Sequence, residues 1–166
     1  MKRGDLTLDH ESRARRDDHQ ALRLWLRILS CSNVIEQQVR RGLRREFHTT
    51  LPRFDFMAQL DRNPAGLKMG EISEMMMVTG GNVTGIADEL EAAGLVARHA
   101  VRGDRRAYTV KLTKAGRRKF GEMARAHERW IVSLFAGLSK REQSQLFEPL
   151  AKLKRHAASR NGELGG

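Results

Sequence analysis

The 166-residue sequence lacks three features that define large classes of protein: a second cysteine, a long apolar run and a cluster of histidines. Cys31 alone cannot form an internal disulfide, which fits a reducing compartment. No apolar run approaches about 18 residues and the first twenty residues are charged throughout. We therefore expect no membrane span, no secretory signal and a cytoplasmic protein.

Catalytic and metal-binding motifs are also missing. The sequence has no nucleophile motif and no phosphate-binding glycine loop, and its histidines are dispersed without the spacing of metal ligands. The six histidines are His10, His19, His48, His99, His127 and His156. We expect a protein with no catalytic residues, no metal and no cofactor, and therefore not an enzyme.

What the sequence does have is positive charge. The formal net charge is +11 and the pI is about 10.8, which favours an anionic partner. Charge alone would suit RNA or a membrane surface as well as DNA. Its distribution is more specific, because residues 98–119 carry nine basic side chains against Asp104 alone.

Residues 67–94 show helical periodicity in two short stretches, with apolar residues recurring three and four positions apart. Thr79 to Gly81 separate the two stretches; Thr79 is placed to cap the second helix and Gly94 to end it. The apolar stripes are Met69, Ile72, Met75 and Met76 in the first stretch and Val83, Ile86, Ala87, Leu90 and Ala93 in the second. This pattern predicts a helix-turn-helix.

The period changes to alternation after Gly94, which indicates two strands. Apolar positions alternate from Leu95 to Val101 and again from Tyr108 to Leu112, and residues 102–106 between them form a basic hairpin turn. A helix-turn-helix followed by a basic hairpin is a winged helix. We therefore predict a mainly α fold with a small β wing.

The segment from Asp88 to Gly116 resembles the signature of the MarR family of bacterial transcriptional regulators. In that signature a Leu-Glu-x-x-Gly-Leu-Val helix end precedes an Asp-Arg-Arg wing and a strand that ends in Leu-Thr-x-x-Gly. The matching residues are Leu90, Glu91, Gly94, Leu95, Val96, Arg98, Asp104, Arg105, Arg106, Leu112, Thr113 and Gly116. The resemblance implies a two-fold homodimer on a pseudo-palindromic double-stranded DNA operator, usually as a repressor.

The second helix of the pair would enter the major groove and the wing would reach the adjacent minor groove or backbone. Asn and Thr side chains can bond to base edges, and glycines let backbone amides approach phosphate. The helix has no Arg or Lys, so we expect wing, phosphate and shape readout to dominate. In the wing, the resemblance implies that Asp104 orients Arg106. The predicted DNA-binding residues are Thr79, Gly80, Gly81, Asn82, Thr84, Arg98, Arg102, Asp104, Arg105 and Arg106.

Long helices flank this region, one over residues 19–47 and one over 114–136, and both have wide apolar faces. We expect further helices after Leu51-Pro52 and after a capping box at Ser139, with Pro149 kinking or splitting the last one. Thr113 should cap the helix that follows it, and Leu67 and Lys68 should add a short third strand to the wing. The predicted organisation is a mobile arm (1–18), a helical dimerisation region (19–50 and 114–157), a winged-helix lobe (51–113) and a flexible tail (158–166).

The MarR resemblance also implies a small-molecule effector that releases DNA, and we expect an aromatic acid or its CoA thioester. Arginines near the end of the first long helix are either a solvated face or a basic mouth for such an anion. The predicted ligand-binding residues are Arg40, Arg44, His48, Phe54, Met57 and Met123. The alternatives are a non-specific architectural DNA-binding protein and a redox regulator acting through Cys31, although its apolar stripe predicts a buried thiol.

Overall fold

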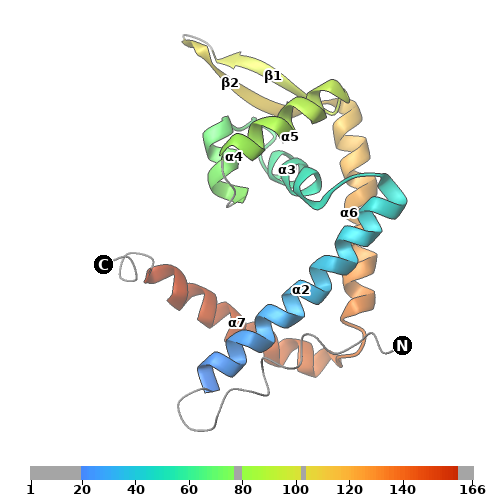
Figure 1. Cartoon of the computed structure of the whole chain (residues 1–166), viewed down its shortest axis with the longest axis vertical. Coiled ribbons are helices and arrows are strands. Elements are labelled where there is room, and N and C mark those ends of the chain that lie inside the picture. Colours follow the sequence, from blue (N-terminus) through green and yellow to red (C-terminus); the bar gives the residue numbers. More distant parts are fainter. Residues whose placement is uncertain (1–19, 77–79, 102–103, 161–166) are drawn as a thin grey trace, which may run out of the picture. The chain divides into compact units, whose positions relative to one another are not determined.

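The computed structural model describes residues 20–76, 80–101 and 104–160, and the predicted arm and tail lie outside these ranges. Two units are described separately, one ending at Glu128 and the other beginning at Arg129. The elements, shown in Figure 1, are α2 (Gln20–Phe47), α3 (Leu51–Arg62), α4 (Met69–Met76), α5 (Gly80–Ala92), β1 (Val96–Val101), β2 (Asp104–Leu112), α6 (Lys114–Leu134) and α7 (Lys140–Ser159). The predicted mainly helical fold with a two-stranded wing is confirmed.

The first long helix, α2, is buried only near its C-terminal end, at Val39, Gly42 and Leu43. Its N-terminal half exposes large apolar side chains, including Trp25 at 54%. The expectation that Cys31 is buried is wrong for the single chain, where this residue is exposed. The reason is that, among the described elements of the first unit, none covers the apolar stripe of α2 at that level.

The core of the first unit lies where α3, α4, α5 and the hairpin pack together (Figure 1). Phe56, Leu60, Ile72, Val83 and Val110 are each no more than 2% exposed. The predicted stripe of α5 is buried at all four positions from Val83 to Leu90, whereas Ala93 lies beyond the end of the helix and is exposed.

The predicted stripe of α4 is wrong at one position. Ile72 is fully buried, but Met75 is 46% exposed and Met69 and Met76 are half-buried. An eight-residue helix has little more than two turns, so only one residue faces the centre of the core.

Gly94 makes the turn between α5 and the wing. Its φ is +69°, a backbone conformation that favours glycine, and its N–H bonds to the carbonyl of Glu91 at 2.8 Å. The next amide, that of Leu95, bonds to the carbonyl of Leu90 at 2.9 Å. These bonds close the helix C-terminus and direct the chain into β1, as the sequence predicted.

The wing is an antiparallel pair in which Val96 faces Leu112 and Val101 faces Asp104, with an irregularity between Ala100 and Val101. Leu67 and Val110 exchange both backbone hydrogen bonds, at 2.8 and 3.1 Å, which confirms the predicted third strand as a single bridge. β2 already begins at Asp104, so the predicted turn over residues 102–106 is too long.

Thr113 joins the base of the wing to α6. Its hydroxyl donates to the carbonyl of Gly94 at 2.7 Å and accepts from the amide of Gly116 at 2.9 Å. Its own amide bonds to the carbonyl of Leu95 at 3.0 Å. The predicted cap is confirmed, and it also ties α6 to the turn that follows α5.

In the second unit, the capping box at the start of α7 is confirmed. The amide of Ser139 bonds to Glu142 Oε2 at 2.8 Å, and the amide of Glu142 bonds to Ser139 Oγ at 3.3 Å. This bonding lowers the pKa of Glu142. Pro149 lies inside α7, which remains one helix, so the expected alternative of a split is wrong.

Gly116→Ala should lower the free energy of unfolding by about 1–3 kcal/mol. The added Cβ would lie 1.9 Å from the carbonyl oxygen of Leu95, and moving that backbone would move the base of the wing. Chemical denaturation measures the loss. Gly121→Ala in the same helix is the control, because its Cβ would meet nothing closer than Arg125 Nη1 at 3.6 Å and should stabilise by up to about 1 kcal/mol. Equal effects at the two sites would contradict this account of Gly116.

Candidate nucleic-acid interface

The helix α5 has one face in the core and one face open. Val83 and Leu90 are buried, while Asn82, Thr84 and Gly85 are exposed. A Cβ built at Gly85 would meet no atom within 4 Å. The first half of α5 thus presents an amide, a hydroxyl and bare backbone with no charged group, as a helix that contacts base edges would. Among the other predicted positions, Gly80 and Gly81 lie in its first turn and Thr79 lies outside the described residues.

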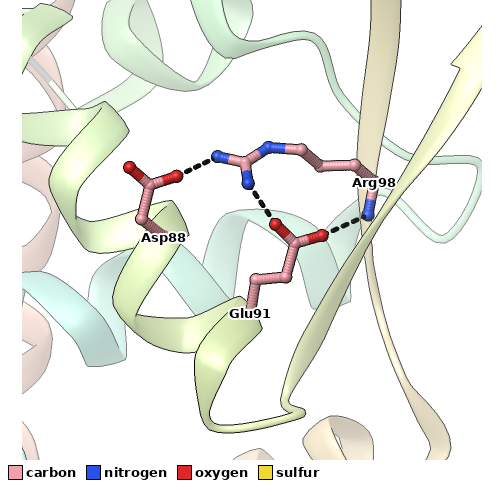
Figure 2. A network of polar contacts seen from close by, with 3 residues as sticks. All are labelled: Asp88, Glu91 and Arg98. Carbon is pink, nitrogen blue, oxygen red and sulfur yellow. Dashed lines mark hydrogen bonds and ion pairs between the residues drawn. The ribbon is translucent and has the colours of Figure 1, made fainter.

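The second half of α5 is acidic and binds Arg98 of β1 (Figure 2). One terminal nitrogen of Arg98 pairs with Asp88 and the other with Glu91. The backbone amide of Arg98 also bonds to Glu91 Oε1 at 3.2 Å. The structure therefore places this predicted DNA-contacting side chain on the protein's own helix. Sequence reasoning missed Asp88 and Glu91 as its partners, although Glu91 belongs to the recognised motif.

The aromatic ring of Tyr108 completes the surroundings of Arg98. The guanidinium carbon lies 5.3 Å from the ring centroid, a cation–π contact across the hairpin. The Arg98 side chain is 26% exposed. Its pKa is raised, chiefly by the hydrogen bond to Asp88, so the side chain is a permanent cation within this group.

A second arginine, Arg53 of α3, contacts the same helix. Arg53 Nε of α3 donates to Glu89 Oε2 at 2.8 Å. Together, Arg53 and Arg98 contact all three carboxylates of α5, at Asp88, Glu89 and Glu91. The acidic half of α5 is thus paired with cations from two of its neighbouring elements, α3 and β1.

The wing tip carries the remaining predicted DNA contacts. Arg102 lies outside the described residues, and the backbone of Asp104, Arg105 and Arg106 forms the start of β2, at the end of the hairpin opposite α6 (Figure 1). Their side chains are not described. The orienting pair between Asp104 and Arg106 stays a prediction.

The predicted ligand-binding residues are divided between the core and the surface. Phe54, Met57 and Met123 are at most 8% exposed, and the Phe54 ring lies 5.4 Å from Phe120 and 5.1 Å from His127 between centroids. His48 is exposed, with a φ of +51° just after α2. The three apolar residues are therefore packing residues and do not line an open pocket with the arginines.

The arginines of α2 do share a recess, of about 600 Å³. It is lined by Gln37, Arg40, Arg41, Arg44 and Arg45. Arg40 pairs with Glu36, and Arg45 Nη2 lies 2.9 Å from Glu46 Oε1. Gln37 was missed, although its spacing from Arg40 and Arg41 puts it on their face.

A half-buried carboxyl, that of Asp55, lies near Arg40 of this recess. Burial raises the pKa of Asp55 in α3, and the positive charge of Arg40 opposes the shift. Within the described ranges no three His, Cys, Asp or Glu residues gather as a metal site would require. None of the described helices combines the length and apolar character needed to cross a bilayer.

Comparison with known proteins matches this geometry. A family model described as "MarR family" matches residues 49–107, which run from α3 into the wing. The crystal structure of a MarR family transcriptional regulator from Silicibacter pomeroyi superposes with a TM-score of 0.73 at 33% identity, covering 86% of this chain and 99% of that one. The chain belongs to the MarR family.

The curated relatives include one protein named as a repressor and one named as an activator of transcription. The HTH-type transcriptional repressor MdtR of Bacillus subtilis is 35% identical over 91 residues, 55% of this chain and 59% of MdtR. The transcriptional activatory protein BadR of Rhodopseudomonas palustris is 31% identical over 99 residues, 58% of this chain and 56% of BadR. The matches thus span less than two thirds of these relatives. The family resemblance found in the sequence is confirmed, and both relatives are transcriptional regulators by name.

The stability of this MarR-family chain should fall as the pH drops below about 6.5, the ordinary pKa of histidine. Burial beside Phe54 lowers the pKa of His127, so below that pH the unfolded chain binds a proton that the folded chain resists. Thermal unfolding at pH 7.5 and 5.5 should show a smaller difference for His127→Gln. The control is His99→Gln, the same change at an exposed position of β1. Identical pH dependence of both variants would refute this role of His127.

Proposed function

We propose that this MarR-family chain is a transcriptional regulator, most often acting as a repressor, that binds a pseudo-palindromic operator as a homodimer. The observation that carries the proposal is the pairing of an uncharged, exposed helix face with a basic hairpin beside it. Asn82 and Thr84 lie on that face, and residues 98–119 hold nine basic side chains against one acidic one. Base readout by α5 and backbone or minor-groove contact by the wing would then act together.

Exposed apolar surface supports the homodimer. Trp25 and Val34 on α2 are 54% and 48% exposed, and Phe147 on α7 is 72% exposed. Further large apolar side chains on α2, α6 and α7 are at least 37% exposed. Patches of this kind mark interaction surfaces, and a second copy of the chain supplies matching apolar helices.

An effector is the less developed part of the proposal. Four arginines around one recess suit the anionic group of an aromatic acid or of its CoA thioester. The five lining residues include no aromatic side chain to hold the ring. Isothermal titration with aromatic acids and their CoA thioesters, followed by competition with bound DNA, tests this part. The absence of displacement by any of them would remove it.

Two alternatives are open to direct tests. An architectural protein would cover DNA at large, whereas a regulator protects one palindromic site in a footprint. A thiol-based regulator would lose DNA binding in mild peroxide, and the exposure of Cys31 in the single chain favours testing this. Retained binding after peroxide treatment would exclude the redox alternative.

Arg106→Ala should weaken binding to the selected operator by about 1–3 kcal/mol and reduce the salt dependence, because it removes a wing cation. Asn82→Ala should weaken binding to the operator but not binding to a random-sequence duplex, since it removes a contact to a base edge. Fluorescence anisotropy at matched salt measures both. The control Lys152→Ala removes one charge from exposed α7 and should change neither affinity. Unchanged operator affinity of Arg106→Ala would refute the assignment of the wing.

Phe147→Glu should shift the protein from dimer to monomer in sedimentation experiments. Placing a charge on the most exposed large apolar side chain of α7 should raise the dimer dissociation constant at least about tenfold, or about 1.4 kcal/mol. Met75→Glu makes the same kind of change on exposed α4 and should leave the dimer intact. A monomeric wild-type protein would contradict the homodimer.

A further inference from the structure

The proposed recognition helix carries an unexpected charge. α5 holds three carboxylates, at Asp88, Glu89 and Glu91, and no Arg or Lys. Carboxylates beside the DNA backbone would repel phosphates, so their presence on this helix needs a reason. Each of them pairs with an arginine from a neighbouring element, and two of the three share Arg98.

Arg98 connects three elements at one point. Its guanidinium spans Asp88 and Glu91, one turn apart on α5, while its backbone belongs to β1 and Tyr108 of β2 lies under its cationic group (Figure 2 shows the contacts to α5). Arg98 faces Val110 in the strand register, two residues outward from the Val96–Leu112 pair at the base of the wing. The base is held by Thr113, and β2 is bridged to Leu67 at Val110, the residue that faces Arg98. The Arg98 contacts hold β1 to α5 at this same level, and the contact with Tyr108 reaches two residues farther toward the tip.

We propose that Arg98, Asp88 and Glu91 form a positioning group that sets the direction of the wing relative to α5, so that helix and wing meet adjacent grooves together. This inference rests on the proposed DNA-binding function. Arg98 acts through the wing and is a positioning residue. The role of Asp88 and Glu91 on α5 is to hold Arg98.

The geometry argues against Arg98 as a phosphate ligand. Both terminal nitrogens already donate to carboxylates, and a planar guanidinium that bridges two acids makes charge-assisted bonds of defined direction. Moving the side chain to a phosphate would break both ion pairs. It would also leave two carboxylates of α5 without their cation near the DNA. A fixed hairpin, in contrast, loses less conformational freedom when its tip binds.

The test asks whether removing two negative charges from α5 strengthens or weakens DNA binding. Removing two negative charges from α5 by Asp88→Asn with Glu91→Gln should strengthen DNA binding if charge alone matters. If the two acids position the wing, the double variant should weaken binding about tenfold despite its more positive charge. The matched control is Glu89→Gln, which removes a charge from the same helix but whose partner, Arg53, comes from α3. It should bind as tightly as the wild type or slightly more tightly.

A second set of variants tests whether Arg98 influences DNA binding through the wing. Arg98→Met, which keeps the length of the side chain, and Arg98→Lys, which keeps the charge but cannot bridge two carboxylates, should both weaken binding. In a background of Arg105→Ala with Arg106→Ala, the same changes should cost less than about twofold, because the wing no longer contributes. Circular dichroism melting confirms that each variant is folded.

All affinities are measured by anisotropy at one salt concentration, on a duplex that the wild type selects from a random-sequence pool. A wild type that selects and binds no duplex refutes the proposed function itself. A wild type that binds, with tighter binding by the double variant or a full Arg98 effect in the wing-tip background, overturns the positioning role alone. Weaker binding by the double variant, equal binding by Glu89→Gln and a reduced Arg98 effect in that background support it.

Discussion

The backbone at Gly94 and Leu95 is the point through which α5, the wing and α6 are joined. The amide of Leu95 closes the end of α5, its carbonyl accepts the amide of Thr113, and Gly116 packs so closely on that carbonyl that no side chain fits between them. The Thr113 hydroxyl adds a bond to the carbonyl of Gly94. Because these contacts are backbone to backbone or involve one short side chain, they leave little freedom. The proposed groove-reading elements therefore share one rigid base.

The charged residues are not spread evenly over α5 and the wing: α5 has an uncharged half and an acidic half, and the wing is basic. The first half of α5 is uncharged and exposed at Asn82 and Thr84, so any affinity it adds should depend on base identity. The second half is acidic, but its carboxylates are paired with Arg53 and Arg98 of neighbouring elements. The excess of positive charge lies in and after the wing, where attraction to phosphates depends little on sequence. On the proposed function, specificity and affinity would therefore come from different elements.

Local signals in the sequence predicted most of the fold, because they act over a few residues. Gly94, Thr113 and Ser139 each end or begin a helix as their chemistry requires, and the helix start at Leu51-Pro52 is confirmed. What sequence reasoning missed depends on contacts between separate elements. Cys31 lies on an apolar stripe that the described part of one chain leaves exposed, and the ion pairs of Arg98 join β1 to residues seven and ten positions away on α5. Phe54, Met57 and Met123 have the helical spacing that is usual for core residues, and the sequence could not exclude a pocket; their burial shows that they pack in the core.

The helix α3 lies between the α2 recess and α5 in the network of contacts, so an effector bound in that recess would influence α5 through α3. A ligand shifts a conformational equilibrium only by the difference in its affinity for the two conformations. An anionic effector must therefore change the electrostatic interactions of at least one protein group. Arg40 lines the recess, its charge favours the ionised form of Asp55 on α3, and α3 packs against α5. An anion on Arg40 would weaken the support for that half-buried carboxylate, and any resulting shift of α3 would reach the proposed recognition helix through this packing. The apolar core contacts of Phe54, on the same helix, would oppose such a shift, which limits this route to small displacements.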